Sequence, residues 1–170
     1  MNEQDTQKGK YVTFMSGHEY FGLKIEYVNE IIVMQEITAI PESEDYIKGL
    51  INLRGKIIPV IDVRLRFRQE PFTYNDRTCI IVIQVQSTVV GLIVEKIAEV
   101  VEIREENILP SPSIGAGDKK LQDRYVYAIG KVGDSVKLLL DPDKLLNDDD
   151  MSVIEKVTGT EEKESKQYEE

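Results

Sequence analysis

The sequence contains few residues of the types that usually carry out catalysis. It has one histidine, His18, and one cysteine, Cys79, and about sixty positions separate them. A metal site built from imidazole or thiolate ligands needs several such residues at short spacings, and a nucleophile–base pair would have to recruit His18. Aspartate and glutamate are numerous, but no two of them are distinguished as acid and base. We therefore expect no catalysis, metal or cofactor, and favour a binding module.

Two other segments match ligand-binding motifs only in part. Gly115-Ala116-Gly117 lacks the third glycine of a dinucleotide-binding loop and the Gly-Lys pair of a phosphate-binding loop. Asp148-Asp149-Asp150 lacks the alternating ligands and closing glutamate of a calcium loop. We interpret the first segment as an ordinary loop. The second is typical of a helix start, where the helix dipole favours negative charge.

One charged side chain could serve protein recognition. Arg54 lies within residues 51–64, INLRGKIIPVIDVR, which are otherwise largely apolar. Asn52 and Gly55 indicate a turn, and an unpaired arginine is costly to bury, so Arg54 either faces solvent or has a carboxylate partner. The guanidinium is either an ordinary charge at a hairpin tip or a group held for docking, because arginine is enriched in interface hot spots. Periodicity does not decide between these interpretations.

Charge and hydropathy exclude two classes of partner. The formal net charge is −10, whereas phosphate neutralisation needs clustered lysine and arginine, so we expect no nucleic-acid binding. No apolar run reaches the ~20 residues that cross a bilayer, and the polar start MNEQDTQKGK does not resemble a secretory signal. A single cysteine permits no intramolecular disulfide and fits a reducing compartment. We expect a cytoplasmic protein without direct membrane insertion.

The sequence contains an internal repeat. Residues 22–32, GLKIEYVNEII, match residues 91–101, GLIVEKIAEVV, at a shift of 69 positions. Residues 59–62, PVID, match residues 138–141, LLLD, at a shift of 79 positions. The ten extra residues fall within residues 111–124, whose proline and glycine content marks an inserted loop. Two copies of one structural unit explain this pattern.

Each copy is rich in short, strand-like segments of β-branched residues bounded by turn formers. These segments span residues 11–15, 36–40, 47–53, 56–63, 79–85, 89–94, 100–103, 125–132 and 135–140. Such punctuation predicts a mainly β fold of small barrels or a sandwich. Residues 26–31 and 96–100 place apolar residues three apart, which is enough for a helical turn. Short helices are expected after Asp141 and over residues 151–157, and residues 1–9 and 158–170 are expected to be disordered tails.

Several motifs of this chain are specific when taken together in order and spacing. The most specific are IKG, NLRG and PVIDVR, a series that begins at Ile47 and ends at Arg64. The flanking motifs are EYFGL at residues 19–23, VNEI at residues 28–31 and DPDKLL at residues 141–146. Together they resemble the motifs of CheW-type chemotaxis coupling proteins. The resemblance runs from about Tyr11 to Met151 and predicts a CheW-like domain over residues 10–150.

This resemblance implies a non-enzymatic adaptor built of two pseudo-symmetric, five-stranded SH3-like barrels packed together, with short C-terminal helices. The repeat then assigns the first barrel mostly to residues 11–70 and the second mostly to residues 76–146. Family members join the regulatory domain of a CheA-type histidine kinase to the cytoplasmic tips of methyl-accepting chemoreceptors. The expected location is therefore the cytoplasm, with recruitment to membrane-associated receptor arrays.

The resemblance also implies a receptor-coupling surface. By motif position it contains Arg54, Val28, Glu30 and Gly49, with Ile97 as the counterpart of Val28 in the second copy. We expect Glu30 to pair with Arg54 and orient it. Val28 and Ile97 could instead be core residues, and Gly49 could serve only backbone geometry. Residues that contact the kinase are not assigned, because their apolar pattern does not differ from that of a core.

Three other interpretations stay open. A CheV-type adaptor would add a phosphate-accepting receiver domain, but only about twenty residues follow the start of the expected C-terminal helix at residue 151. A free regulatory domain of the kinase would share the fold, although the chain starts at Met1 and lacks kinase sequence. A small hydrolase or peptide-processing enzyme would need the nucleophile–base pair that the sequence does not offer.

Overall fold

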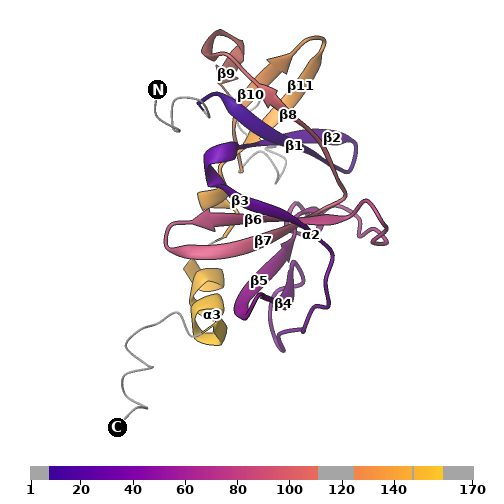
Figure 1. The fold of residues 1–170 in the computed structure, drawn as a ribbon, viewed down its shortest axis with the longest axis vertical. Helices are drawn as coiled ribbons and strands as arrows, with labels where there is room; N and C mark the ends of the chain where they lie inside the picture. The colour runs from indigo at the N-terminus through magenta and orange to yellow at the C-terminus, as the bar shows by residue number, and fades with distance from the viewer. Residues whose placement is uncertain (1–7, 111–124, 147, 159–170) are drawn as a thin grey trace.

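The computed structural model describes residues 8–110, 125–146 and 148–158, and it confirms a mainly β fold with few helices (Figure 1). Sheet I is six-stranded, in the order β8-β1-β2-β11-β10-β9, and lies at the top of the figure. Its strands are β1 (Lys10–Ser16), β2 (Glu19–Lys24), β8 (Lys96–Glu102), β9 (Ile108–Pro110), β10 (Val126–Val132) and β11 (Ser135–Leu140). Sheet II is five-stranded, in the order β3-β6-β7-β5-β4, and lies below it. Its strands are β3 (Val28–Val33), β4 (Ile47–Leu53), β5 (Lys56–Asp62), β6 (Cys79–Val85) and β7 (Thr88–Val94).

Each sheet combines strands from both copies of the repeat. The equivalent strands are β1 and β6, β2 and β7, and β3 and β8 at a shift of 69, and β4 and β10, and β5 and β11 at a shift of 79. Exchanging equivalents turns the order β3-β6-β7-β5-β4 into β8-β1-β2-β11-β10, so the two sheets share one topology. However, the hairpin β1–β2 pairs with β8 and β11 of the second copy, and the hairpin β6–β7 pairs with β3 and β5 of the first. The two copies therefore exchange their first hairpins.

This exchange contradicts the expected division into barrels of residues 11–70 and 76–146. The connections explain why. Between β2 and β3 there is only the short 3₁₀ helix η1 (Ile25–Tyr27), and between β7 and β8 there is only Glu95. These connections carry the chain straight into the other sheet, so the third strand of each copy does not pair with its own hairpin.

Both sheets close on themselves in the same way: the segment that follows one edge strand pairs with the strand at the opposite edge. After β3 the chain returns to the far edge of sheet II, where Thr38 and Leu50 exchange two backbone hydrogen bonds of 2.8 Å. After β8 the chain passes the 3₁₀ helix η2 (Glu105–Asn107) and pairs as β9 with β10 at the far edge of sheet I. The strand expected over residues 36–40 is thus reduced to one bridge. Closure protects sheet edges that would otherwise offer unpaired backbone groups.

A shared core joins the sheets. Phe14 and Phe21 of sheet I and Leu92 of sheet II belong to one buried cluster, which also takes Ile154 from the C-terminal helix α3 (Asp148–Thr158). Two smaller clusters lie one in each sheet. Truncating a buried phenylalanine to alanine in such a core typically costs ~3–5 kcal/mol. Apolar burial therefore couples the two sheets into one folding unit.

A short helix and a network of aromatic and charged groups lie at the centre of the molecule. Helix α2 (Val63–Arg66) follows β5, and the guanidinium carbon of Arg66 lies 4.4 Å from the ring centre of Tyr46 and 4.8 Å from that of Tyr125. The two tyrosines are equivalent in the repeat at a shift of 79. The Tyr46 hydroxyl donates to the carboxylate of Asp150 at 2.5 Å, which fastens α3 to this cluster. Burial and this hydrogen bond raise the pKa of Tyr46, so it stays a donor throughout the physiological range.

The predictions for local helical segments are confirmed only in part. The helical turn expected over residues 26–31 is limited to η1, and residues 96–100 form part of β8 instead, because three apolar residues in five fit either structure. The C-terminal helices are confirmed as η4 (Pro142–Lys144), with Asp141 as its N-cap, and α3. Of the expected tails, residues 1–7 and 159–170 lie outside the described residues, as does the inserted segment 111–124. Gly9 and Thr158 are part of the described structure, and the Gly9 carbonyl accepts a 2.8 Å bond from Ile103.

Candidate docking site

The hairpin tip between β4 and β5 holds Arg54 in a strained backbone conformation. Leu53 pairs with Lys56, so Arg54 and Gly55 form a two-residue turn, with φ angles of 53° and 87°. Such turns favour Asn-Gly, because residues with a larger side chain pay a cost at positive φ. The equivalent position in the second copy is Gly133, with a φ of 59°. The turn itself would therefore be satisfied by glycine, and strain of this kind often marks a functional residue.

Arg54 pairs with Glu30, as the sequence predicted. Arg54 Nη2 donates to Glu30 Oε2 at 2.5 Å, and the two side chains are 69% and 32% exposed. Glu30 lies on β3 and Arg54 at the tip of β4–β5, the two edges of sheet II that closure brings together. Exposed ion pairs contribute little to stability. The pair therefore orients the guanidinium at the surface more than it supports the fold.

The pair changes the titration of both groups. The hydrogen bond from Arg54, with its positive charge, lowers the pKa of Glu30, and the same contact raises the pKa of Arg54. The pair consequently persists above the lowered pKa of Glu30. It is lost only when the pH falls through that value and the carboxylate is protonated.

Replacing Arg54 with alanine should raise the pKa of Glu30 toward the ordinary glutamate value, because the largest cause of the depression is removed. The measurement is the ¹³C shift of the Glu30 side-chain carboxyl followed by NMR through an acid titration. Lys56→Ala is the matched control, because it removes a charge from the same hairpin without touching the pair. An unchanged Glu30 titration in the Arg54 variant would contradict the pairing in solution.

The other two first-copy residues of the predicted surface have strong structural roles. Val28 is half-buried on β3 and packs against the shared core. Gly49 lies on β4 beside an irregularity in the pairing with β5, at a φ of 145°. A methyl group on Gly49 would lie 2.0 Å from the carbonyl oxygen of Thr38. The geometry accounts for glycine at position 49 without any partner.

Ile97 lies apart from the Arg54–Glu30 pair, on the other sheet, but it faces the same strand β3. A shallow groove of about 530 Å³ runs between the two sheets there. Besides Ile97, its lining comes from three places. These are Lys96 of β8, Cys79 of β6 with the nearby Arg77, and the β3 residues Ile31, Ile32 and Val33. Ile31 and Val33 are large apolar residues that are 43% and 75% exposed. Exposed apolar side chains in one place indicate a site for an apolar partner surface.

Sequence reasoning missed Ile31 and Val33. Alternation along β3 is regular, with positions 28, 30 and 32 more buried than positions 29, 31 and 33. The signal was therefore an apolar residue on the outward face of an alternating strand. It could not be read without knowing which face was outward, because β3 carries apolar side chains on both faces.

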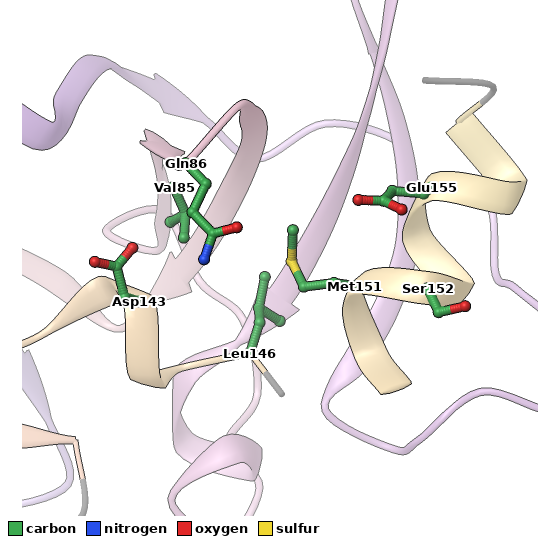
Figure 2. A pocket seen from close by; sticks show the side chains of 7 residues that line it. All are labelled: Val85, Gln86, Asp143, Leu146, Met151, Ser152 and Glu155. Carbon is green, nitrogen blue, oxygen red and sulfur yellow. The ribbon is translucent and has the colours of Figure 1, made fainter. Parts of the chain in front are cut away.

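A second pocket is polar and lies at the end of the molecule near α3 (Figure 2). It has a volume of about 290 Å³ and lies between the β6–β7 turn, η4 and α3. Its carboxylates, Asp143 and Glu155, come from opposite sides of the opening, and its hydroxyl, Ser152, lies on α3. None of the residues lining it is a histidine or cysteine.

The described residues contain neither a cluster of metal-ligating side chains nor a helix that could span a membrane. No group of three or more His, Cys, Asp or Glu side chains there is arranged to hold a metal ion. None of the helices in that part of the chain has the length and apolar character to cross a bilayer. Cys79, on the groove, is partly buried, and burial raises the pKa of its thiol, which disfavours the reactive thiolate.

Comparison with known proteins assigns the family. The model of the CheW-like domain matches residues 10–150. The chain is 33% identical over 153 residues to the chemotaxis protein CheW of Klebsiella aerogenes, covering 90% of each, and 31% identical over 138 residues to that of Bacillus subtilis, covering 81% and 86%. The crystal structure of the scaffolding protein TtCheW from Thermoanaerobacter tengcongensis matches with a TM-score of 0.73 and 36% identity, covering 81% of this chain and 91% of that one. With the shared fold and the resemblance in its motifs, this chain belongs to the CheW-like family of chemotaxis scaffolding proteins.

Proposed function

We propose that this protein is a non-enzymatic adaptor that couples the cytoplasmic tips of transmembrane chemoreceptors to the regulatory domain of a CheA-type histidine kinase. The observation that carries the proposal is the Arg54–Glu30 pair. An exposed guanidinium is held in a strained turn, beside a carboxylate that orients it, where the fold would accept glycine. A preoriented arginine suits recognition of a polar or acidic partner surface.

The groove beside β3 supplies the apolar part of the proposed receptor surface. Ile31 and Val33 on one side and Ile97 on the other give it a lining that an amphipathic receptor helix can cover. The Arg54–Glu30 pair and the groove share strand β3, but Glu30 lies on the face opposite Ile31 and Val33, so a partner that engages both must reach across this strand. The proposed surface therefore contains Arg54, Glu30, Val28 and Ile97 of the expected residues, with Gly49 supporting β4 underneath.

The kinase would use a different surface. Ile57 of β5 and Val136 of β11 are equivalent in the repeat at a shift of 79, and they are 43% and 52% exposed. Core packing does not explain apolar residues exposed at the same position in both copies. A partner that shares this fold could contact such positions, and contact with two partners in a state-dependent manner is all that coupling requires. Recruitment to receptor arrays at the membrane follows from these two contacts.

The test is co-sedimentation of the purified protein with receptor-containing membranes and the kinase. The kinase should sediment with the membranes only when this protein is present, and membranes without receptors should retain neither protein. Kinase that sediments equally well without this protein would contradict the adaptor role. So would a protein that binds the kinase but never reaches the receptor membranes.

A further inference from the structure

A partly buried ion pair joins the two sheets at one of the points where the chain passes between them. Glu95 is the single residue between β7 of sheet II and β8 of sheet I. Its Oε1 accepts a 2.6 Å hydrogen bond from the backbone N–H of Gly17, in the β1–β2 turn of sheet I. The same oxygen accepts a 2.5 Å hydrogen bond from Nη1 of Arg64, in α2 directly after β5 of sheet II. One carboxylate thus holds parts of both sheets together.

Arg64 is itself fixed from several directions. The carboxylate of Asp62 caps α2 by accepting the backbone N–H of Arg64 at 2.9 Å. Arg64 Nε donates to the Glu70 carbonyl at 2.7 Å, and its guanidinium lies 5.3 Å from the ring centre of Phe72. The side chains of Arg64 and Glu95 are only 17% and 19% exposed. Charge pairs shielded from solvent to this degree are screened less than surface pairs.

A neighbouring contact reinforces the connection. Ser16, at the end of β1, donates through its hydroxyl to Oε1 of Gln69 at 2.9 Å. Gln69 lies just beyond α2, so the segment after β5 is fastened twice to the end of the β1–β2 hairpin. These contacts lie outside the shared apolar core, which is non-directional. They can therefore set an orientation that apolar burial alone would leave loose.

The repeat shows that the fold does not require this pair. The equivalent of Glu95 in the first copy is Glu26, in η1 at the other crossing, and the equivalent of Arg64 in the second copy is Asp143. Both are acidic, so no ion pair can form between them. The chain thus passes between the sheets at two crossings, η1 and Glu95. The crossing at Glu95 is fastened by an ion pair, and the crossing at η1 has no equivalent pair. The fastened crossing is the one that begins β8, whose first two residues, Lys96 and Ile97, line the groove.

Resting on the proposed function, we propose that Arg64 and Glu95 are positioning residues for receptor recognition. They hold Ile97 of sheet I at a fixed place opposite Ile31 and Val33 of sheet II, so that the groove keeps the width that one receptor segment fits. Neither residue lines the groove. Their effect on receptor binding passes through the mutual orientation of the two sheets. The proposed kinase contacts, Ile57 on sheet II and Val136 on sheet I, each lie within one sheet, so a kinase domain that meets either of them does not depend on this orientation.

The decisive variant is Glu95→Gln, which keeps the size of the side chain and an acceptor for Gly17 but removes the negative charge. Glu26→Gln is the matched control, because it makes the same change at the equivalent position of the other crossing. Affinities are measured separately for a receptor-tip fragment and for the kinase regulatory domain. The orientation of the sheets is measured as the distance distribution between spin labels at Gln84→Cys and Ser135→Cys, in a Cys79→Ser background.

Glu95→Gln should broaden the distance distribution and weaken receptor-fragment binding by about tenfold, a typical size for one coupling interaction. Kinase-domain affinity should stay within about twofold, and Glu26→Gln should change neither quantity. Arg64→Lys retains the charge and should keep more receptor affinity than Arg64→Ala. Equal losses for the receptor fragment and the kinase domain would indicate a merely structural role and overturn the proposal.

The outcomes separate this proposal from the adaptor role itself. A wild-type protein that binds neither partner would contradict the adaptor role. A wild-type protein that binds both, with receptor binding or a distance distribution unaffected by Glu95→Gln, would overturn the positioning role alone. If Glu95→Gln does not fold, Arg64→Lys decides: a receptor affinity selectively reduced supports the role, and an unchanged one overturns it.

Discussion

Replacing Arg54 with glutamate should abolish most receptor-dependent control of the kinase while leaving the protein folded. The side chain is 69% exposed, and exposed substitutions usually change the free energy of unfolding by less than about 0.5 kcal/mol. The new carboxylate would face Glu30, so the site would present two like charges where it now presents a guanidinium. Loss of one interface arginine commonly costs ~2 kcal/mol or more of binding free energy, which corresponds to a loss of affinity of about thirtyfold.

The measurement is kinase activity in reconstituted receptor membranes, with unfolding by urea as the check on stability. Lys56→Glu is the matched control, because it makes the same charge change two residues away on the same exposed hairpin. The double variant Arg54→Glu, Glu30→Arg reverses the pair. Restored control would show that the orientation of the pair matters, and continued loss would show that the guanidinium itself meets the receptor. Unchanged control in the single variant would contradict the docking role of Arg54.

Replacing Gly49 with alanine should destabilise the protein by about 3 kcal/mol or more, the range of severe backbone and packing defects. The added methyl would lie 2.0 Å from the Thr38 carbonyl oxygen, so the Thr38–Leu50 bridge that closes sheet II must open or shift. The positive φ of 145° adds strain for any L residue other than glycine. The measurement is the urea midpoint of unfolding followed by circular dichroism.

Gly55→Ala is the matched control for this prediction. Gly55 also has a positive φ, but nothing lies within 4 Å of an added methyl. Gly55→Ala should therefore lower the free energy of unfolding by only ~1–2 kcal/mol, the cost of the left-handed conformation for a residue other than glycine. Equal losses in the two variants would show that the Thr38 contact does not matter. A Gly49 variant that is as stable as wild type yet deficient in receptor coupling would place Gly49 on the docking surface itself.

The sequence predicted the features that depend on local spacing and composition. Strand-forming segments, the turn at Arg54 and the equivalence of residues 22–32 with 91–101 were all visible, because side-chain period and turn residues act within a few positions. The Glu30–Arg54 pair followed from the family motifs together with charge complementarity. This pair spans 24 positions, and no local rule would have found it.

The pairing of strands between copies could not be predicted. A repeat shows that two units are alike, but hydrogen bonding is equally possible within and between like units. The choice was made by the short connections at η1 and Glu95, and the apolar spacing around them fits a helical turn as well as a strand. For the same reason the Arg64–Glu95 pair was missed, since its members come together only through the exchange. The groove at Ile97 was also hidden, because its two sides belong to different sheets.

The exchanged hairpins also decide what one half of this chain could do alone. A fragment carrying only β1 to β5 would hold a hairpin whose partner strands, β8 and β11, lie in the missing half. Such a fragment could complete its sheets only by trading hairpins with a second copy of itself, as a twofold-symmetric dimer. Its folding would then depend on protein concentration. Covalent fusion of the two halves replaces that dependence with an effective concentration that can reach the millimolar range, so the tandem chain assembles at any dilution.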